Sequence, residues 1–152
     1  MKIECWFTGK TWEGFVLEGM NMYALRLKPI MPILLKEFRD VGTGPDAPEK
    51  EAAQIIKALS PNDILILLDE NGTLYSSREF AHHLDKLRMR ASSRIIFLAG
   101  GAYGFSSTLR NRSQGAISLS PMTFNHQLVR LVFLEQLYRA ATILHNHPYH
   151  HD

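Results

Sequence analysis

Two runs of five consecutive apolar residues, ILILL at 64–68 and IIFLA at 95–99, constrain this chain more than any other feature. A strand with one face in water alternates apolar and polar residues, whereas an uninterrupted apolar run is typical of a strand buried on both faces. Strands of that kind belong to parallel sheets whose two faces are covered by helices. The two runs therefore predict the centre of a parallel α/β sheet.

The remaining segments continue this alternation of strands and helices. Further strands are expected at 3–7, 33–38 and 116–119, and helices at 12–27, 49–59, 76–90, 106–111 and 124–144. The third of these helices begins with a capping box, because Glu79 follows three residues after Ser76. We expect a single α/β domain over residues 1–152, with a mainly parallel sheet and helices on both faces.

The formal net charge of +2 conceals two unlike parts. Residues 1–85 hold nine Lys and Arg against thirteen Asp and Glu, whereas residues 86–152 hold eight against two. A basic surplus confined to one part of a chain indicates a surface that faces an anionic partner. Charges that folding mixes back across the surface explain the same counts, so the asymmetry alone does not decide between the two interpretations.

The sequence also lacks the features of membrane and secreted proteins. Its apolar runs fall far short of the roughly 18 residues that span a bilayer, and Glu4 interrupts the apolar stretch after Lys2 that a signal peptide would need. The single cysteine, Cys5, cannot form an intramolecular disulfide, which is typical of a reducing compartment. We therefore expect a cytoplasmic protein that does not enter the membrane.

Several motifs for other chemistries are excluded. Gly100, Gly101 and Gly104 lack the G-x-G-x-x-G spacing of a dinucleotide site, and the GKT at 9–11 lacks the earlier glycine of a P-loop. Nothing follows the pattern of a serine nucleophile elbow, a carboxylate pair or a zinc H-E-x-x-H motif. Four histidines occupy the last eight residues, but no cysteine lies near them, and we expect no metal site.

Three expected strand ends are candidate ligand sites, because parallel α/β folds bind ligands beyond the carboxyl ends of their strands. They are 68–69, 99–101 and 119–121. Gly100 and Gly101 would let backbone groups approach a ligand closely, although a tight turn without a ligand explains them too. Asp69 could be catalytic at its strand end, but we favour a turn over residues 69–72.

Two further groups are candidates for substrate contact. The first is a set of arginines that could contact phosphates: Arg88, Arg90, Arg94, Arg110 and Arg112. The second is the C-terminal tail, in which Tyr149 and His150 could close over an active site and handle protons.

Several longer motifs resemble one known family. They are LLD at 67–69, SREF at 77–80, FLAGGAYGF at 97–105, SLSPMTFNH at 118–126, EQLYRA at 135–140 and NHPYH at 146–150. Together they closely resemble the bacterial ribosomal RNA large subunit methyltransferase H (RlmH) family, of the SPOUT class. The resemblance is collinear and runs from the N-terminal strand to the tail.

This resemblance implies a fold and an activity. The fold would be a five- or six-stranded α/β domain with a C-terminal trefoil knot, forming homodimers. The activity would be transfer of a methyl group from S-adenosylmethionine to N3 of a pseudouridine in 23S rRNA, on assembled ribosomes. Neither DNA nor a membrane is implied as a partner.

Site residues also follow from the resemblance. The cofactor would be bound by Leu68, Gly100, Gly101, Leu119, Ser120, Pro121, Met122, Thr123 and Phe124. Tyr149 and His150 from one subunit would complete the site of the other, with His126 and Arg130 as additional candidates for positioning the base or its phosphate. The chain departs from the family at His151 and Asp152, where we expect a basic residue after Tyr-His.

Two other functions remain open. One is a SPOUT methyltransferase that acts on tRNA or on another rRNA site, since its cofactor pocket would be nearly the same. The other is a non-catalytic protein that binds RNA or the ribosome and keeps a vestigial pocket.

Overall fold

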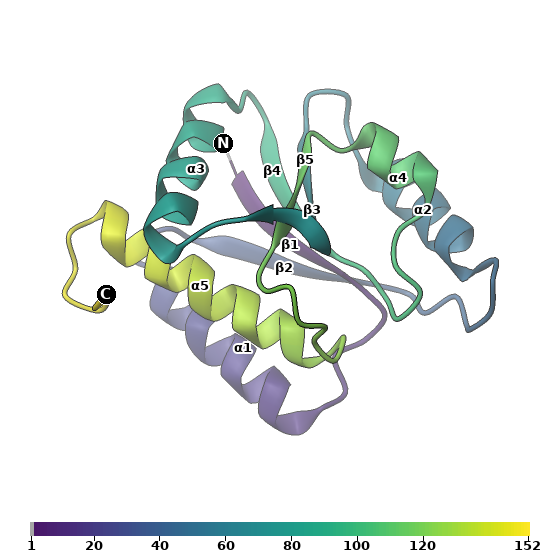
Figure 1. The fold of residues 1–152 in the computed structure, drawn as a ribbon, viewed down its shortest axis with the longest axis horizontal. Helices are drawn as coiled ribbons and strands as arrows, with labels where there is room; N and C mark the ends of the chain where they lie inside the picture. Colours follow the sequence, from purple (N-terminus) through teal and green to yellow (C-terminus); the bar gives the residue numbers. More distant parts are fainter. Residues whose placement is uncertain (1) are drawn as a thin grey trace.

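The computed structural model describes residues 2–152, in which strands and helices alternate in sequence order (Figure 1). The strands are β1 (Lys2–Thr8), β2 (Ile33–Phe38), β3 (Ile64–Leu74), β4 (Arg94–Ala99) and β5 (Gly115–Ser118). The helices are α1 (Gly14–Leu27), α2 (Ala47–Ala58), α3 (Ser77–Arg90), α4 (Ser107–Arg112) and α5 (Leu128–Leu144). Each strand and helix expected from the sequence is present, with bounds that shift by a few residues.

The strands form one sheet in the order β2-β1-β4-β3-β5, and all of the paired strands are parallel. The two apolar runs lie side by side in it, since Ile64 of β3 pairs with Ile95 of β4. Among the described residues, no helix is long and apolar enough to cross a membrane. The prediction of a mainly parallel sheet is confirmed.

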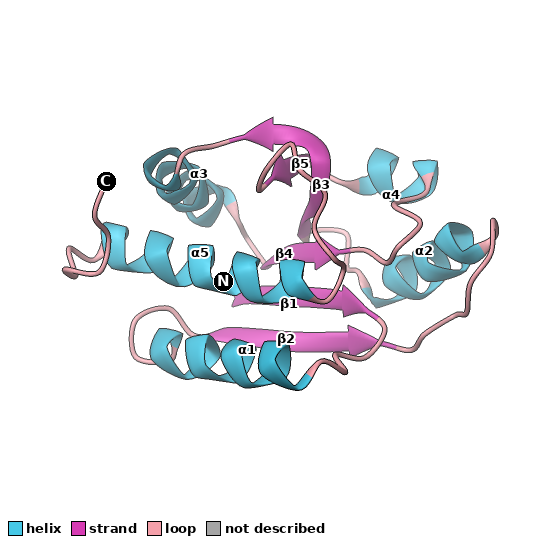
Figure 2. Cartoon of the chain, turned by 60° about the horizontal axis from the view of Figure 1, so that its bottom comes forward, coloured by secondary structure: helices cyan, strands magenta, loops and turns pink. Residues whose placement is uncertain are grey.

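Helices cover both faces of the sheet (Figure 2). Along β1, Ile3, Cys5 and Phe7 pack into the core with α1, α3 and α5, whereas Trp6 packs into a second core with α2 and α4. This alternation follows from the two-residue period of a strand, which sends neighbouring side chains to opposite faces. The prediction of helices on both faces is confirmed.

The expected turn at 69–72 is instead a bulge within β3. Leu68 and Thr73 both pair with Ile117 of β5, so the four residues between them loop out and the strand then continues to Leu74. Within the bulge, Asp69 Oδ1 accepts a hydrogen bond from the Asn71 N–H at 3.1 Å, which is a local turn. A β-carbon on Gly72 would lie 2.6 Å from the Ala116 carbonyl carbon, so the close approach requires glycine. The sequence identified the local turn but not the pairing that resumes after it.

The last helix begins at Leu128 rather than at residue 124. Asn125 Oδ1 accepts hydrogen bonds from the N–H groups of Gln127 (2.8 Å) and Leu128 (3.3 Å). This side chain satisfies backbone donors at the start of α5, as an N-terminal cap does, and holds the preceding residues out of the helix. The segment 119–127 is therefore a loop, and it forms one wall of the cavity described next.

Candidate functional site

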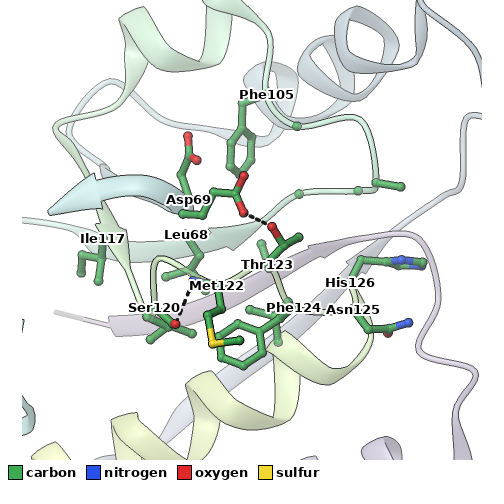
Figure 3. Close-up of a pocket in the computed structure, with 18 residues that line it drawn as sticks. Leu68, Asp69, Phe105, Ile117, Ser120, Met122, Thr123, Phe124, Asn125 and His126 are labelled. Atoms are coloured by element: carbon green, nitrogen blue, oxygen red, sulfur yellow. Dashed lines mark hydrogen bonds between the residues drawn. The ribbon is translucent and has the colours of Figure 1, made fainter. Parts of the chain in front are cut away.

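A cavity of about 410 Å³ lies at the carboxyl ends of β4 and β5, next to the bulge of β3 (Figure 3). All three strand ends that the sequence suggested as ligand sites contribute to it, which is the arrangement expected of a parallel sheet. The lining residues come from β3 and its bulge, from the end of β4 and the β4–α4 loop, and from β5, the β5–α5 loop and the start of α5: Leu68, Asp69, Glu70, Ala99, Gly100, Gly101, Ala102, Gly104, Phe105, Ile117, Leu119, Ser120, Met122, Thr123, Phe124, Asn125, His126 and Val129.

The two glycines after β4 lie close against neighbouring side chains, which a larger residue would push aside. A β-carbon on Gly100 would lie 2.8 Å from Cε1 of Phe105, and one on Gly101 would lie 2.7 Å from Oε1 of Glu51. Partial burial raises the pKa of the Glu51 carboxyl, although a hydrogen bond with the Gly101 backbone opposes this shift. Glu51 therefore supports the glycine loop from outside the cavity.

The β5–α5 loop is held by short hydrogen bonds. Ser118 Oγ donates to the Ser120 carbonyl at 2.9 Å, and Ser120 Oγ accepts from the Met122 N–H at 3.0 Å. Thr123 Oγ1 donates to Glu70 at 2.6 Å, which ties the loop to the β3 bulge (Figure 3). These bonds fix the loop before any ligand arrives. They leave the Met122 side chain 77% exposed.

Asp69 is already engaged at the edge of the cavity. Its carboxylate pairs with Arg110 of α4, whose guanidinium also lies 5.9 Å from the Phe105 ring centroid. The ion pair joins the β3 bulge to the β4–α4 segment. Asp69 therefore helps to shape the site, and the guanidinium of Arg110 is held in the ion pair with Asp69.

The cavity suits an amphipathic ligand such as S-adenosylmethionine. Leu68, Phe105, Leu119 and Phe124 supply apolar walls, and the glycine loop brings backbone polar groups within reach. Its volume lies within the roughly 300–1,000 Å³ of small-molecule sites. The walls could hold a flat base, while the carboxylate of Glu70, which accepts a hydrogen bond from Thr123 but forms no ion pair among the described residues, favours a cationic centre.

The nine residues expected to bind the cofactor lie close together. All of them except Pro121, which is exposed in the same loop, line the cavity. His126 lines it as well, near Asn125 at one end (Figure 3). Phe105, Glu70 and Asn125 also line it but were missed, because nothing in a sequence indicates which residues of a bulge or a loop turn inward.

Arg130 is placed differently from the expectation. Its side chain is 1% exposed and donates hydrogen bonds to the carbonyls of Thr8 (2.8 Å) and Gly9 (3.0 Å) and to Oγ1 of Thr11 (2.8 Å). A guanidinium enclosed in this way cannot reach an RNA phosphate. The interpretation of Arg130 as a substrate contact is therefore replaced by a structural role, in which it anchors α5 to the β1–α1 loop.

The proposed arginine patch does not form either. Arg94 pairs with Asp63 and Glu4, and Arg112 donates to backbone carbonyls of Ser60 and Asp63. With Arg110 bound to Asp69, three of the five arginines are used within the chain.

The C-terminal tail folds back onto the middle of α5. Tyr149 donates to Oε1 of Glu135 at 3.1 Å, and Nδ1 of His150 lies 3.1 Å from Nη1 of Arg139. Glu135 and Arg139 follow Val129 of the cavity lining by six and ten residues, or about 9 and 15 Å along the helix at 1.5 Å per residue. Neither Tyr149 nor His150 is among the residues that line the cavity. Burial raises the pKa of Tyr149, and hydrogen bonding with Tyr23 adds to the effect, so its phenol stays protonated at neutral pH.

Comparison with known proteins gives consistent results. Residues 1–150 match a family model described as a predicted SPOUT methyltransferase. The chain is 42% identical over 157 residues to the ribosomal RNA large subunit methyltransferase H of Parabacteroides distasonis, covering 100% of both proteins. It is 44% identical over 153 residues to the protein of the same name from Geotalea daltonii, covering 99% of this chain and 100% of the relative.

A solved structure shares the fold. It is described as a probable methylase family protein from Haemophilus influenzae and superimposes with a TM-score of 0.55 at 13% identity. The match covers 99% of this chain and 70% of that one.

Proposed function

Because this chain belongs to the SPOUT methyltransferase family, among the ribosomal RNA large subunit methyltransferases H, we propose that it methylates N3 of a pseudouridine in 23S rRNA. The enzyme is an rRNA methyltransferase, and its methyl donor is S-adenosylmethionine. One observation carries the proposal: the family's glycine-loop and LSPMTF segments converge on one cavity of suitable size and chemistry. Assembled ribosomes, in the cytoplasm, are the proposed substrate.

The residues of the cavity have two tasks in this reaction. When bound there, the cofactor supplies a methyl group on a sulfonium, which is a good leaving group. Leu68, Leu119 and Phe124 would enclose the adenine, while backbone groups of the glycine loop and of the β5–α5 loop would bind its polar edge. The fixed loop would hold the methyl group in line with the acceptor nitrogen, which lowers the barrier by orientation.

The N3–H of the acceptor must lose its proton when the methyl group is attached. His126 lies at the cavity and is one candidate to accept or relay this proton. His150, from the tail, is the other. Tyr149 has a raised pKa and remains protonated, so its proposed task is to donate a hydrogen bond and orient the base.

The tail does not line the cavity within one copy of the chain. Its contacts with α5, at Glu135 and Arg139, lie about 9 and 15 Å along the helix from Val129 of the cavity lining. A two-fold dimer with antiparallel α5 helices would bring the tail of each subunit to the cavity of the other. We therefore propose that Tyr149 and His150 act in trans.

The family's trefoil knot is part of the same proposal. The end of β3 crosses the segment that leaves β5, and Leu74 pairs with Ser118 there (Figure 1). The chain then continues into α5, which packs against both α1 and α3. These contacts support threading of the C-terminal segment behind the end of β3.

The experiment is methyl transfer from labelled S-adenosylmethionine to ribosomes and to bulk tRNA, with a blocked-pocket variant. Ala102 is exposed and lines the cavity, so Ala102→Trp fills it without removing any bond made by that side chain. Tyr103→Trp, at an exposed neighbour outside the lining, is the matched control.

We expect label in ribosomal RNA with the wild type and with Tyr103→Trp, and loss of at least about a hundredfold with Ala102→Trp. S-adenosylmethionine should raise the melting temperature of the first two proteins but not of the third. Label in tRNA alone would favour the other SPOUT activity. Absence of both transfer and thermal shift would favour a non-catalytic protein.

A further inference from the structure

The outer face of α3 carries one basic side chain at every fourth position. Its inner face buries Phe80, Ala81, Leu84 and Leu87 in the core. The opposite face presents a set that we term the α3 basic row: Arg78, His82, Lys86 and Arg90, all of them exposed. Residues four apart are neighbours on the surface of a helix, so the row is continuous, and it winds by about 120° around α3 from Arg78 to Arg90.

Most of this charge is not neutralised within the chain. Across the described residues, Lys86 and Arg90 lie more than 4 Å from every carboxylate, whereas Arg78 pairs with Asp152 at 2.9 Å. The acidic residues of the helix are Glu79, which is held in the capping box by Ser76, and Asp85. The pKa of His83 is lowered by burial first, and then by the charges of Lys86 and Arg90.

The row has a length suited to a nucleic-acid backbone. Four residues of helix rise about 6 Å, so the row spans about 18 Å from Arg78 to Arg90. Lys86 and Arg90, about 6 Å apart along the helix axis, can contact successive phosphates of one strand, and such contacts position the protein without reading sequence. A protein with an acidic surface would meet the same charges, but the proposed substrate is RNA.

The position of the row connects it to the proposed active site. Arg78, at its first position, holds Asp152 of the tail, and Asp152 Oδ1 lies 2.6 Å from Nε2 of His150. In the free protein, the Asp152 carboxylate thus occupies Arg78 where a phosphate could bind. The row therefore starts beside the tail and leads away from it.

We propose that the α3 basic row binds the phosphate backbone of the rRNA next to the target nucleotide. This inference rests on the proposed function, since it assumes that the tail meets the target base. It also locates the basic surplus of residues 86–152 on the surface of the molecule. Three of the candidate arginines are bound within the chain, namely Arg94, Arg110 and Arg112, whereas Arg90 is free to contact RNA.

The test reverses two charges of the row one at a time. Lys86→Glu and Arg90→Glu are compared with Lys57→Glu, an exposed lysine of α2 on the other face of the sheet. Ribosome methylation is measured as KM and kcat over a range of salt concentrations. Lys86→Gln and Arg90→Gln are measured as well. A glutamate near the C-terminal end of a helix destabilises the helix through its dipole, and the Gln variants remove the positive charge without adding this effect. Melting temperature, mass in solution and S-adenosylmethionine affinity are recorded for each variant.

We expect the KM for ribosomes to rise about tenfold for each reversal, with a smaller rise for the Gln variants and none for Lys57→Glu. The salt dependence of binding should weaken by about one unit of slope for each phosphate that the variant no longer neutralises. The affinity for S-adenosylmethionine and the dimer mass should stay unchanged. Equal KM values for row and control variants, while the wild type methylates rRNA normally, would overturn the inference but leave the proposed function intact.

Crosslinking identifies what the row touches. Met89 is 81% exposed and neighbours Lys86 and Arg90 on the helix surface, so a photoreactive p-benzoylphenylalanine in its place reports on the occupant. We expect crosslinks to 23S rRNA. Crosslinks only to a ribosomal protein, or only to the second subunit, would contradict the proposed occupant.

Discussion

At the scale of single residues, Arg130 shows how far a side chain's type can mislead about its role. An arginine in a basic region was expected near the substrate, yet it anchors the start of α5 to the β1–α1 loop. Gln127 supports the same joint, since its Oε1 accepts from the Trp12 N–H at 2.9 Å. Because this joint follows directly after the β5–α5 loop, it also holds one wall of the cavity.

Replacing Arg130 by methionine should therefore affect both stability and cofactor binding. The change leaves buried carbonyls of Thr8 and Gly9 without partners, and we expect a loss of about 3 kcal/mol in unfolding free energy. Urea unfolding measures it, with the exposed Arg39→Met as the control. A stable variant with normal affinity for S-adenosylmethionine would show that the joint is dispensable.

Glu51 gives a prediction about pH at the same scale. Its pKa is raised above the ordinary value of 4.5 by burial, so the folded protein holds this proton more tightly than the unfolded chain does. Its contribution to stability is therefore fully present below about pH 4.5 and falls as the pH rises through the folded-state pKa. Glu51→Gln should melt at a higher temperature than the wild type at pH 7, and this difference should shrink on acidification. A constant difference from pH 4 to pH 7 would argue against a raised pKa.

At the scale of elements, the β3 bulge determines where the cavity forms. It displaces Asp69 and Glu70 toward the cavity, and the strand then pairs with β5 again. Two side-chain contacts tie the bulge to its neighbours: Asp69 to Arg110 of α4, and Glu70 to Thr123 of the β5–α5 loop. The bulge thus links all three segments that line the site.

Gly72→Ala tests this role. The added methyl group would lie 2.6 Å from the Ala116 backbone, which cannot move aside as a flexible side chain can. We expect a loss of about 2 kcal/mol in stability together with weaker cofactor binding, because β5 must shift away from β3. Gly14→Ala is the matched control, since a β-carbon there meets nothing within 4 Å and alanine favours the start of α1. Equal behaviour of the two variants in thermal melts would contradict the tight approach.

Sequence patterns predicted elements well where local physics decides them. The apolar runs identified β3 and β4, and the Ser76–Glu79 capping box identified the start of α3. Sequence patterns did not predict structure that depends on residues distant in the sequence. One example is the pairing of β3 with β5, which resumes after the bulge. The glycine loop was predicted as a candidate ligand site and lines the cavity, but the docking of Glu51 behind it depends on packing between elements far apart in the sequence.

At the scale of the whole molecule, the cavity and the C-terminal tail do not meet within one copy of the chain. The tail docks on Glu135 and Arg139 of α5 and does not line the cavity, so in the arrangement that we propose a complete active site requires two copies. The RNA surface would then combine the α3 basic row of one subunit with the cavity of its partner.

Mixed dimers test this arrangement directly. A chain truncated after Asn146 keeps its cavity but lacks the tail, and an Ala102→Trp chain keeps the tail but has a blocked cavity. Each homodimer should be inactive on ribosomes. An equal mixture, unfolded and refolded together, should recover about one quarter of wild-type activity, because half of the dimers hold one complete site. No recovery in dimers of verified composition would mean that the tail acts within its own subunit, and an active truncated homodimer would mean that the tail is not needed.

The most direct test of the central claim is to locate the transferred methyl group. Ribosomes that lack the modification are incubated with the protein and deuterium-labelled S-adenosylmethionine, and their 23S rRNA is digested and analysed by mass spectrometry. We expect one labelled methyl group on N3 of a single pseudouridine, absent with Ala102→Trp and present with Tyr103→Trp. A label on a ribose, on another base or in tRNA alone, or no label at all, would contradict the account.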